Sequence, residues 1–152
     1  MKKLIGLLAF VFVCSAYGCS LIAAGSYPYV ERYKYKIAED SLIGILEALK
    51  ANDSSLAVPE RYRPSDGRRG SSGYWYFIYF YNKERDEIIA TWTRTSIDTA
   101  YTTFAFVGIK KREDVGNWKE INHDFGRKEN RARKKEFKAL ILDRIHLPVK
   151  ED

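Results

Sequence analysis

Residues 74–81 read Tyr-Trp-Tyr-Phe-Ile-Tyr-Phe-Tyr, and seven of these eight positions are aromatic. Aromatic residues favour extended backbone, and successive side chains of a strand point to opposite faces of a sheet. One face of this predicted strand carries Tyr74, Tyr76, Ile78 and Phe80, and the other carries Trp75, Phe77, Tyr79 and Tyr81. Both sets are apolar enough to need cover, so we expect a central strand with packing on both sides.

Two more strands are predicted downstream of this one. Residues 82–86 are polar and would form a hairpin loop, whereas residues 87–94 and 101–109 are again rich in β-branched and aromatic side chains. Because the three segments follow one another closely along the chain, we expect them to pair as an antiparallel meander.

Helical patterns lie on both sides of the predicted meander. Apolar residues recur at helical spacing over residues 33–50, and a second helix is predicted from Arg127 to His146, where Pro148 closes it. Helices that flank an antiparallel sheet are typical of the α+β class. We therefore expect a two-layer α+β domain, in which a three- or four-stranded antiparallel meander is flanked by an N-terminal and a C-terminal helix.

The connecting segments carry weaker signals. Residues 52–73 are rich in turn formers and include Arg68 and Arg69, so they are predicted to form an exposed basic loop. This loop has room for a short edge strand within residues 56–62. Residues 115–121 are predicted to contain a helical turn.

Composition limits the class of protein. The chain has 152 residues, 45% hydrophobic and 30% charged, which fits one globular domain and excludes a polytopic membrane protein and a fully disordered chain. Lys and Arg number 26 against 20 Asp and Glu, which gives a formal charge of +6. An excess of basic residues of this kind suggests nucleic acid as a partner, so it matters in which cellular compartment the chain resides.

The N-terminal residues have the parts of a secretory signal in order. Lys2 and Lys3 precede a run of apolar residues, and small residues then lead to Gly18 and Cys19. This stretch resembles the signal of a bacterial lipoprotein precursor, with Ala16 at the position where that class usually has Leu. The resemblance implies cleavage between Gly18 and Cys19 and attachment of lipid to the Cys19 thiol.

This resemblance divides the chain into a signal peptide (1–18), a lipidated N-terminus and tether (19–31) and a single folded domain (32–152). Two other interpretations stay open. An ordinary signal peptidase would cut the same bond and release a soluble protein, and residues 4–25 lack any charge over a length that spans a bilayer. All three export the domain from the cytoplasm. For a lipoprotein of a Gram-negative cell, Ser20 implies sorting to the outer membrane, facing the periplasm.

Basic residues concentrate at the start of the C-terminal helix. Residues 127–138 contain seven Lys and Arg against two Glu, an excess larger than the formal +4 that remains once Lys2 and Lys3 are removed. Export removes nucleic acid as a partner, and phospholipid or lipopolysaccharide headgroups become the available anions. The candidate anion-binding residues are Arg127, Lys128, Arg131, Lys134 and Lys135. The alternative interpretation is a solvated helix face.

Catalysis receives little support from the sequence. His123 and His146 are the only histidines, and neither belongs to a triad or to a metal-ligand spacing. A dispersed site that uses Asp98, Glu120, Asp124 or tyrosine residues would be needed instead. We therefore expect no catalytic residue, no metal and no cofactor, and a small exported enzyme is the third hypothesis.

The leading hypothesis is a membrane-tethered protein of the cell envelope that binds another envelope protein, either in an assembly or as an inhibitor or immunity-type partner. An aromatic strand face that stays uncovered would be the best interaction surface. The candidate surface residues are Trp75, Phe77, Tyr79, Tyr81, Arg68 and Arg69. Binding of anionic lipid headgroups is the second hypothesis.

Overall fold

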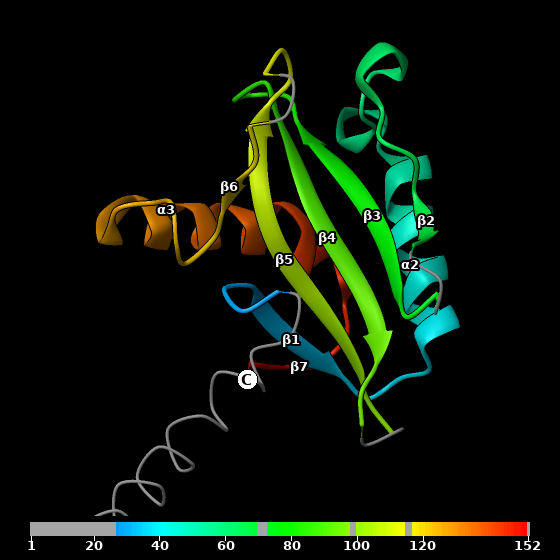
Figure 1. Cartoon of the computed structure of the whole chain (residues 1–152). Coiled ribbons are helices and arrows are strands. Elements are labelled where there is room, and N and C mark those ends of the chain that lie inside the picture. Colours follow the sequence, from blue (N-terminus) through cyan, green and yellow to red (C-terminus); the bar gives the residue numbers. More distant parts are fainter. Residues whose placement is uncertain (1–26, 70–72, 98–99, 115–116, 152) are drawn as a thin grey trace, which may run out of the picture.

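The computed structural model describes residues 27–69, 73–97, 100–114 and 117–151 (Figure 1). It has the α+β architecture predicted from the sequence, with an antiparallel sheet and helices packed on one of its faces. The predicted signal peptide with Gly18, the lipidation site Cys19 and the tether up to residue 26 lie outside the described residues.

Three long strands form the centre of the sheet, as predicted. They are β3 (Trp75–Asn82), β4 (Glu87–Thr95) and β5 (Thr102–Lys111), and they pair in that order as an antiparallel meander. The pairing places aromatic and β-branched side chains opposite one another, as in the row formed by Thr93 and Phe104, and such pairs stabilise a sheet.

Short strands extend the sheet beyond the three or four strands expected. The sheet of the described residues has seven strands in the order β2-β3-β4-β5-β1-β7, with β6 paired to β5 off this path. The short strands are β1 (Glu31–Tyr35), β2 (Gly67–Arg69), β6 (Lys119–Glu120) and β7 (Val149–Glu151). One edge of β5 serves two partners, because β1 pairs with its first half and β6 with its second.

The N-terminal helix begins later than the sequence predicts. A helix was expected over residues 33–50, but Glu31–Tyr35 is strand β1 and helix α2 spans Glu39–Asn52. The two tyrosines of β1 also fit a period of two, and pairing with β5 buries both of them. The acidic residues of the first turn of α2 suit the positive end of a helix dipole, so the helix begins there.

Two weaker predictions are wrong. The expected edge strand within residues 56–62 is replaced by two short 3₁₀ helices, Ser54–Leu56 and Glu60–Tyr62, and the edge strand is β2. Pro59 precedes the second of these turns and has no N–H to donate to a sheet. The expected helical turn within residues 115–121 is replaced by β6, which pairs with the free edge of β5.

The C-terminal helix lies where the sequence predicts but is not regular. It consists of α3 (Arg127–Phe137), a π-helical turn (Lys138–Leu142) and the short α4 (Asp143–Ile145). The wider turn changes the phase of the helix, so Leu142 is buried together with the residues one turn away. His146 then adopts the left-handed conformation at φ 56° and ends the helix before β7.

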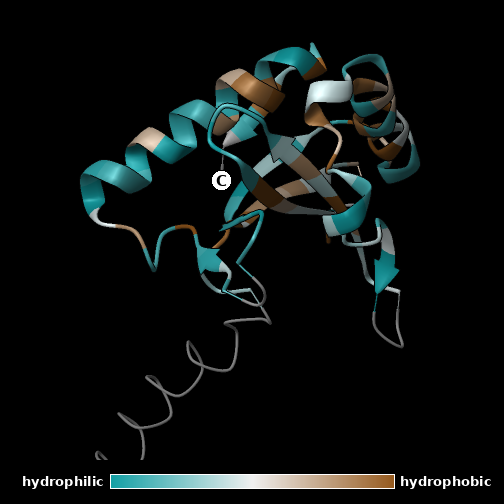
Figure 2. Ribbon diagram, turned by 90° about the horizontal axis from the view of Figure 1, so that it is seen from above, coloured by the Kyte–Doolittle hydropathy of each residue, from teal (hydrophilic) through white to brown (hydrophobic). Residues whose placement is uncertain are grey.

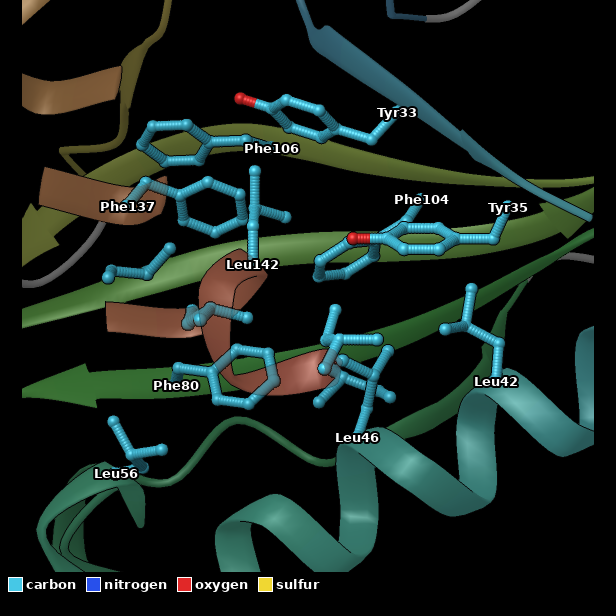
Figure 3. Close-up of a cluster of buried hydrophobic side chains, with 14 of the residues drawn as sticks. Tyr33, Tyr35, Leu42, Leu46, Leu56, Phe80, Phe104, Phe106, Phe137 and Leu142 are labelled. Atoms are coloured by element: carbon cyan, nitrogen blue, oxygen red, sulfur yellow. The ribbon is translucent and has the colours of Figure 1, made fainter. Parts of the chain in front are cut away.

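The main core lies between the sheet and helices α2, α3 and α4 (Figures 2 and 3). Ile78 and Phe80 of β3 point into it, as the alternation of residues 74–81 predicts. The ring of Phe137 stacks on Phe106 with centroids 4.3 Å apart. One face of the aromatic strand is therefore covered by helices.

A β-bulge shapes the other face of the sheet. The register between β4 and β5 shifts at Ala90 and Thr91, where Val107 is the extra residue of β5. The next residue, Gly108, lies so close to β6 that a Cβ there would be 2.4 Å from the carbonyl oxygen of Lys119. The bulge and the glycine thus allow β6 to pack tightly against β5.

Candidate functional site

The second face of the sheet is covered by loops and single side chains. Phe77 and Tyr79 of β3 are buried there beside Trp92 of β4 and Ala105 of β5. No α-helix within the described part of the chain contributes to this cluster. We call this surface the helix-free face.

A groove of about 460 Å³ opens on the helix-free face. It is lined by aromatic side chains, by the bulged segment of β5 and by one residue of each charge. The aromatic lining consists of Tyr27, Trp75, Phe77, Tyr79 and Trp118, and the charged residues are Arg69 and Glu120. We call this site the aromatic groove. Its volume lies within the range of pockets that bind small ligands or protruding side chains.

Ring contacts hold the groove together. The ring of Tyr27 forms edge-to-face pairs with Trp75 and with Phe77, at centroid distances of 5.5 and 6.0 Å. On the other side, Trp118 lies 5.9 Å from Tyr79. Edge-to-face and tilted pairs of this kind are favourable, so the N-terminal segment and the β6 segment both contribute walls to the groove.

Arg69 of β2 lies across the floor of the groove. Its guanidinium is 5.3 Å from the centroid of Phe77 and 5.4 Å from that of Tyr79, both within range of a cation–π contact. The strand that carries it is anchored by Asp66, whose carboxylate accepts a hydrogen bond of 2.9 Å from the backbone N–H of Tyr79 and pairs with Lys50. Asp66 thus holds the backbone next to Arg69 against the aromatic strand.

The electrostatics of the groove keep its phenols neutral. Burial raises the pKa of Tyr27 and of Tyr79, and Arg69 offsets part of this rise by favouring the phenolate. Neutral phenols both donate and accept hydrogen bonds, so the groove offers polar tips on an apolar surface.

Four of the six predicted surface residues come together in the groove, namely Trp75, Phe77, Tyr79 and Arg69. Tyr81 lies on the same face, but its hydroxyl bonds to Asp86 and it does not line the groove. Arg68 points to the opposite side of β2, where it lies over Tyr76 and pairs with Glu39 at 3.4 Å. The alternation of side chains along β2 separates Arg68 from Arg69.

Sequence reasoning missed the walls of the groove. Tyr27 falls within the predicted tether, and Trp118 and Glu120 fall within the predicted helical turn. Trp118 is predicted to lie in that turn because it is three residues from Val115 and from Ile121, a spacing that β6 does not follow. The sequence signal for Tyr27 and Trp118 is a large aromatic residue in a segment that is otherwise polar or rich in glycine, and Glu120 has no such signal.

The predicted anion-binding residues on α3 divide into two groups. Lys134 pairs with Glu31 at 3.0 Å, so it stabilises the fold. The others are exposed and form no salt bridge with a described residue, and they are Arg127, Lys128, Arg131 and Lys135. In Figure 1 the first turns of α3 project beyond the edge of the sheet, which leaves this group accessible.

The histidines lie apart from the groove. His123 Nδ1 is 2.7 Å from Asp124 Oδ1, and the ring of Tyr29 stacks on the imidazole at 4.3 Å. A hydrogen bond from the backbone N–H of Glu120, together with His123, lowers the pKa of Asp124. The described residues contain no group of three or more His, Cys, Asp or Glu side chains that would hold a metal ion. Asp98 lies outside them.

Within the part of the chain that the structure describes, every helix is too short or too polar to cross a bilayer. No family model matches the chain, no curated protein matches it and no solved structure matches it. The chemistry of the aromatic groove is therefore the best guide to its occupant.

Proposed function

We propose that the protein is a membrane-tethered lipoprotein of the cell envelope whose domain binds a partner protein through the aromatic groove, without catalysis. The observation that carries this proposal is a groove on the helix-free face in which three strand-borne aromatic rings lie beside the guanidinium of Arg69.

The residue types and their rigidity support a binding role. Trp, Tyr and Arg supply most of the energetically dominant contacts of protein interfaces, because they offer large area at a small cost in side-chain entropy. Trp75, Phe77 and Tyr79 are carried by β3, one of the central strands, which fixes their spacing. A site on a rigid strand is more specific than one on a loop.

Charge complementarity defines the partner. Arg69 supplies the positive charge of the groove. A partner segment that inserts an aromatic or aliphatic side chain and carries carboxylates beside it would match this surface. Glu120, which also lines the groove, would exclude segments with an acidic residue next to it.

The tether restricts where this partner is found. Tyr27 lines the groove, and Cys19 precedes it by eight residues, which span at most about 30 Å when fully extended. A lipid on Cys19 would therefore hold the groove close to the membrane surface. The partner is accordingly an envelope protein.

Site-specific crosslinking in intact cells tests the groove. A photoreactive phenylalanine analogue in place of Trp118 is expected to give a discrete crosslinked product, and the same analogue at Lys83 in the exposed β3–β4 turn is the matched control. The product should disappear in the Trp75→Ala variant. Equal products from both positions, or a product that persists without Trp75, would refute the groove as the binding site.

Once the partner is identified, its affinity sharpens the test. Trp75→Ala is expected to weaken binding about 30-fold, the equivalent of a contact worth about 2 kcal/mol. Arg127→Gln combined with Lys128→Gln, which changes only exposed residues of α3, should leave the affinity unchanged.

Metabolic labelling with palmitate tests the tether. The native protein is expected to incorporate label and Cys19→Ala is expected to lose it. Label that persists in the variant, or that is absent from both proteins, would refute the lipoprotein assignment and leave the groove to be judged by crosslinking.

A second candidate function is docking of α3 on anionic lipid headgroups. It is favoured by the exposed group on α3, which forms no salt bridge with a described residue. Each such residue near an anionic surface contributes up to about 1 kcal/mol, so binding to phosphatidylglycerol vesicles would fall steeply with salt. Replacement of all four residues by Gln would abolish it. The residues of this group are Arg127, Lys128, Arg131 and Lys135.

A further inference from the structure

A second cavity of about 430 Å³ lies on the helix-free face, separate from the aromatic groove. Four strands contribute to it, and none of the described residues that line it is acidic. Its basic residues are Arg32 and Lys34 of β1, Arg94 of β4 and Lys150 of β7. We call this site the cationic pocket.

Strand register explains how residues so distant in sequence meet. Arg94 pairs with Thr103, Thr103 pairs with Lys34, and Lys34 pairs with Lys150, so the four form one row across the sheet. Cross-strand neighbours in a row share a face, and here Lys34 and Lys150 stand directly opposite each other. Like charges in this position destabilise a sheet.

Two guanidinium groups in the pocket are incompletely satisfied. The Nε atoms of Arg32 and Arg94 are shielded from solvent and have no hydrogen-bond partner among the described residues. Neither side chain forms a salt bridge with a described carboxylate. A shielded donor without an acceptor is costly.

The same guanidinium groups are nevertheless held in place. Arg94 donates from Nη1 to the hydroxyl of Tyr74 at 3.2 Å and lies 5.4 Å from the ring centroid of Trp92. Arg32 donates from Nη2 to the carbonyl oxygen of Tyr27 at 3.5 Å. Groups positioned before a ligand arrives lose less entropy on binding, which favours a specific site over a diffuse patch.

We propose that the cationic pocket binds a phosphate group. Planar guanidinium forks suit the oxygens of a phosphate, lysines add point charges, and hydroxyl groups complete the set of donors. The Oγ of Ser96 lies 2.8 Å from the Oγ1 of Thr103, and both residues line the pocket together with Tyr101. Donors from several directions match a tetrahedral group with several acceptor oxygens better than a planar carboxylate.

This inference is independent of the proposed partner of the aromatic groove, because the two cavities share no described lining residue. The phosphate would come either from a soluble phosphate compound or from the headgroup of a membrane lipid. Both sources present the same oxygens to the pocket, and the experiment below separates them.

Binding of inorganic phosphate and pyrophosphate to the full chain in a zwitterionic detergent is the first measurement, by calorimetry and by thermal unfolding. Both anions are expected to raise the unfolding temperature of the native protein by several degrees at saturation, whereas chloride at equal ionic strength should not. Arg94→Gln combined with Lys150→Gln is expected to lower the affinity at least tenfold. The matched control removes two positive charges from α3 (Arg127→Gln with Lys128→Gln) and should bind as the native protein does.

A second pair of variants shows whether a loss of binding has a cause other than misfolding. Ile97 lines the pocket yet is 98% exposed, so its replacement does not disturb the core. Ile97→Glu would place a carboxylate beside the cations and is expected to lower phosphate affinity at least tenfold, whereas Ile97→Gln should have little effect. Equal binding by these two variants would overturn the proposal, as would loss of binding in the α3 control alone or the absence of binding to the native protein.

Vesicles identify the source of the phosphate. If the ligand is a lipid headgroup, vesicles of phosphatidylglycerol and phosphatidylcholine should bind the native protein and the α3 control but not Ile97→Glu, and pyrophosphate should compete. If the ligand is soluble, the phosphate response persists while the vesicle response does not depend on Ile97. Vesicle binding lost only in the α3 control would support the second candidate function and assign the pocket to a soluble phosphate.

Discussion

The two faces of strand β3 bury aromatic side chains to a similar degree but by different means. Phe80 on one face is completely buried and Phe77 on the other is 7% exposed. Phe80 is covered by helices, whereas Phe77 is covered by single side chains such as Tyr27 and Arg69. Cover by a helix is cooperative with the whole fold, while a single side chain moves at little cost. The buried fraction of a side chain therefore does not distinguish a structural face from a binding face. The kind of element that covers the side chain, a helix or a single side chain, does distinguish them.

The helix-covered face should dominate stability. Phe137→Ala removes a ring that is 1% exposed and stacked on Phe106, and it is expected to lower the free energy of unfolding by about 3–5 kcal/mol. Trp75→Ala in the aromatic groove should cost about 1 kcal/mol. Urea denaturation of both variants measures the difference. Equal losses would break the distinction between the two faces.

The ion pair that joins α3 to β4 should rank next. Arg133 donates from both terminal nitrogens to Glu87, at 2.6 and 3.1 Å, and both side chains are nearly buried. Arg133→Ala leaves a shielded carboxylate whose remaining ion pair among the described residues is with Lys111 at 3.3 Å, and we expect a loss of about 3 kcal/mol. The exposed Arg131→Ala serves as the control, with a change of less than about 0.5 kcal/mol. A similar result for both would mean that α3 is held by apolar contacts alone.

On the helix-free face, Gly108 tests whether the groove depends on the close approach of β6. Gly108→Ala would force β6 away from β5, with an expected loss of about 1–3 kcal/mol and a weaker crosslink from position Trp118. Gly44→Ala, on the exposed side of α2 with no atom within 4 Å, should instead stabilise the protein by up to about 1 kcal/mol. Unfolding curves of the two variants should thus shift in opposite directions.

The smallest effect concerns two tyrosines of β3 on opposite faces. A hydrogen bond to Glu47, 2.7 Å long, raises the pKa of Tyr76 to about 12, whereas burial raises the pKa of Tyr79. A raised pKa in the folded state contributes stability below pH 10, and this contribution is lost as the pH rises from 10 to 12. Tyr76→Phe should therefore cost about 1 kcal/mol at neutral pH and much less near pH 12. Absorbance at 295 nm and denaturation at both pH values check this; a cost that stays constant with pH would contradict it.

The central sheet could be predicted because its signal is dense and local. Residues 74–81 alternate between two apolar sets, and β4 and β5 follow as similar runs. The error at residues 33–50 arose where two periods overlap, since Tyr35 fits the helical spacing of the apolar residues that follow it and also, with Tyr33, the period of two of a strand. Pairing with β5 decided between them, and such pairing is a tertiary effect.

The candidate sites were only partly accessible from the sequence. The alternation of side chains along β3 predicted that Trp75, Phe77 and Tyr79 share one face of the sheet, because all three belong to one strand. The groove walls and the cationic pocket depend on residues from separate strands and loops, and Arg32 and Lys150 lie at opposite ends of the folded domain in sequence. Only the register of the sheet makes them neighbours.

The position of Tyr27 gives the domain a mechanical property. The rings of Trp75 and Phe77 hold this residue, and it lies just before β1, so tension applied through the preceding chain reaches the groove before it reaches the sheet. Ring contacts yield one at a time, whereas the hydrogen bonds of β1 with β5 and β7 on its two sides resist together. A pull from the N-terminal side would therefore unseat Tyr27 and widen the groove while the sheet stays intact. The domain would then respond to load by changing the shape of its binding site.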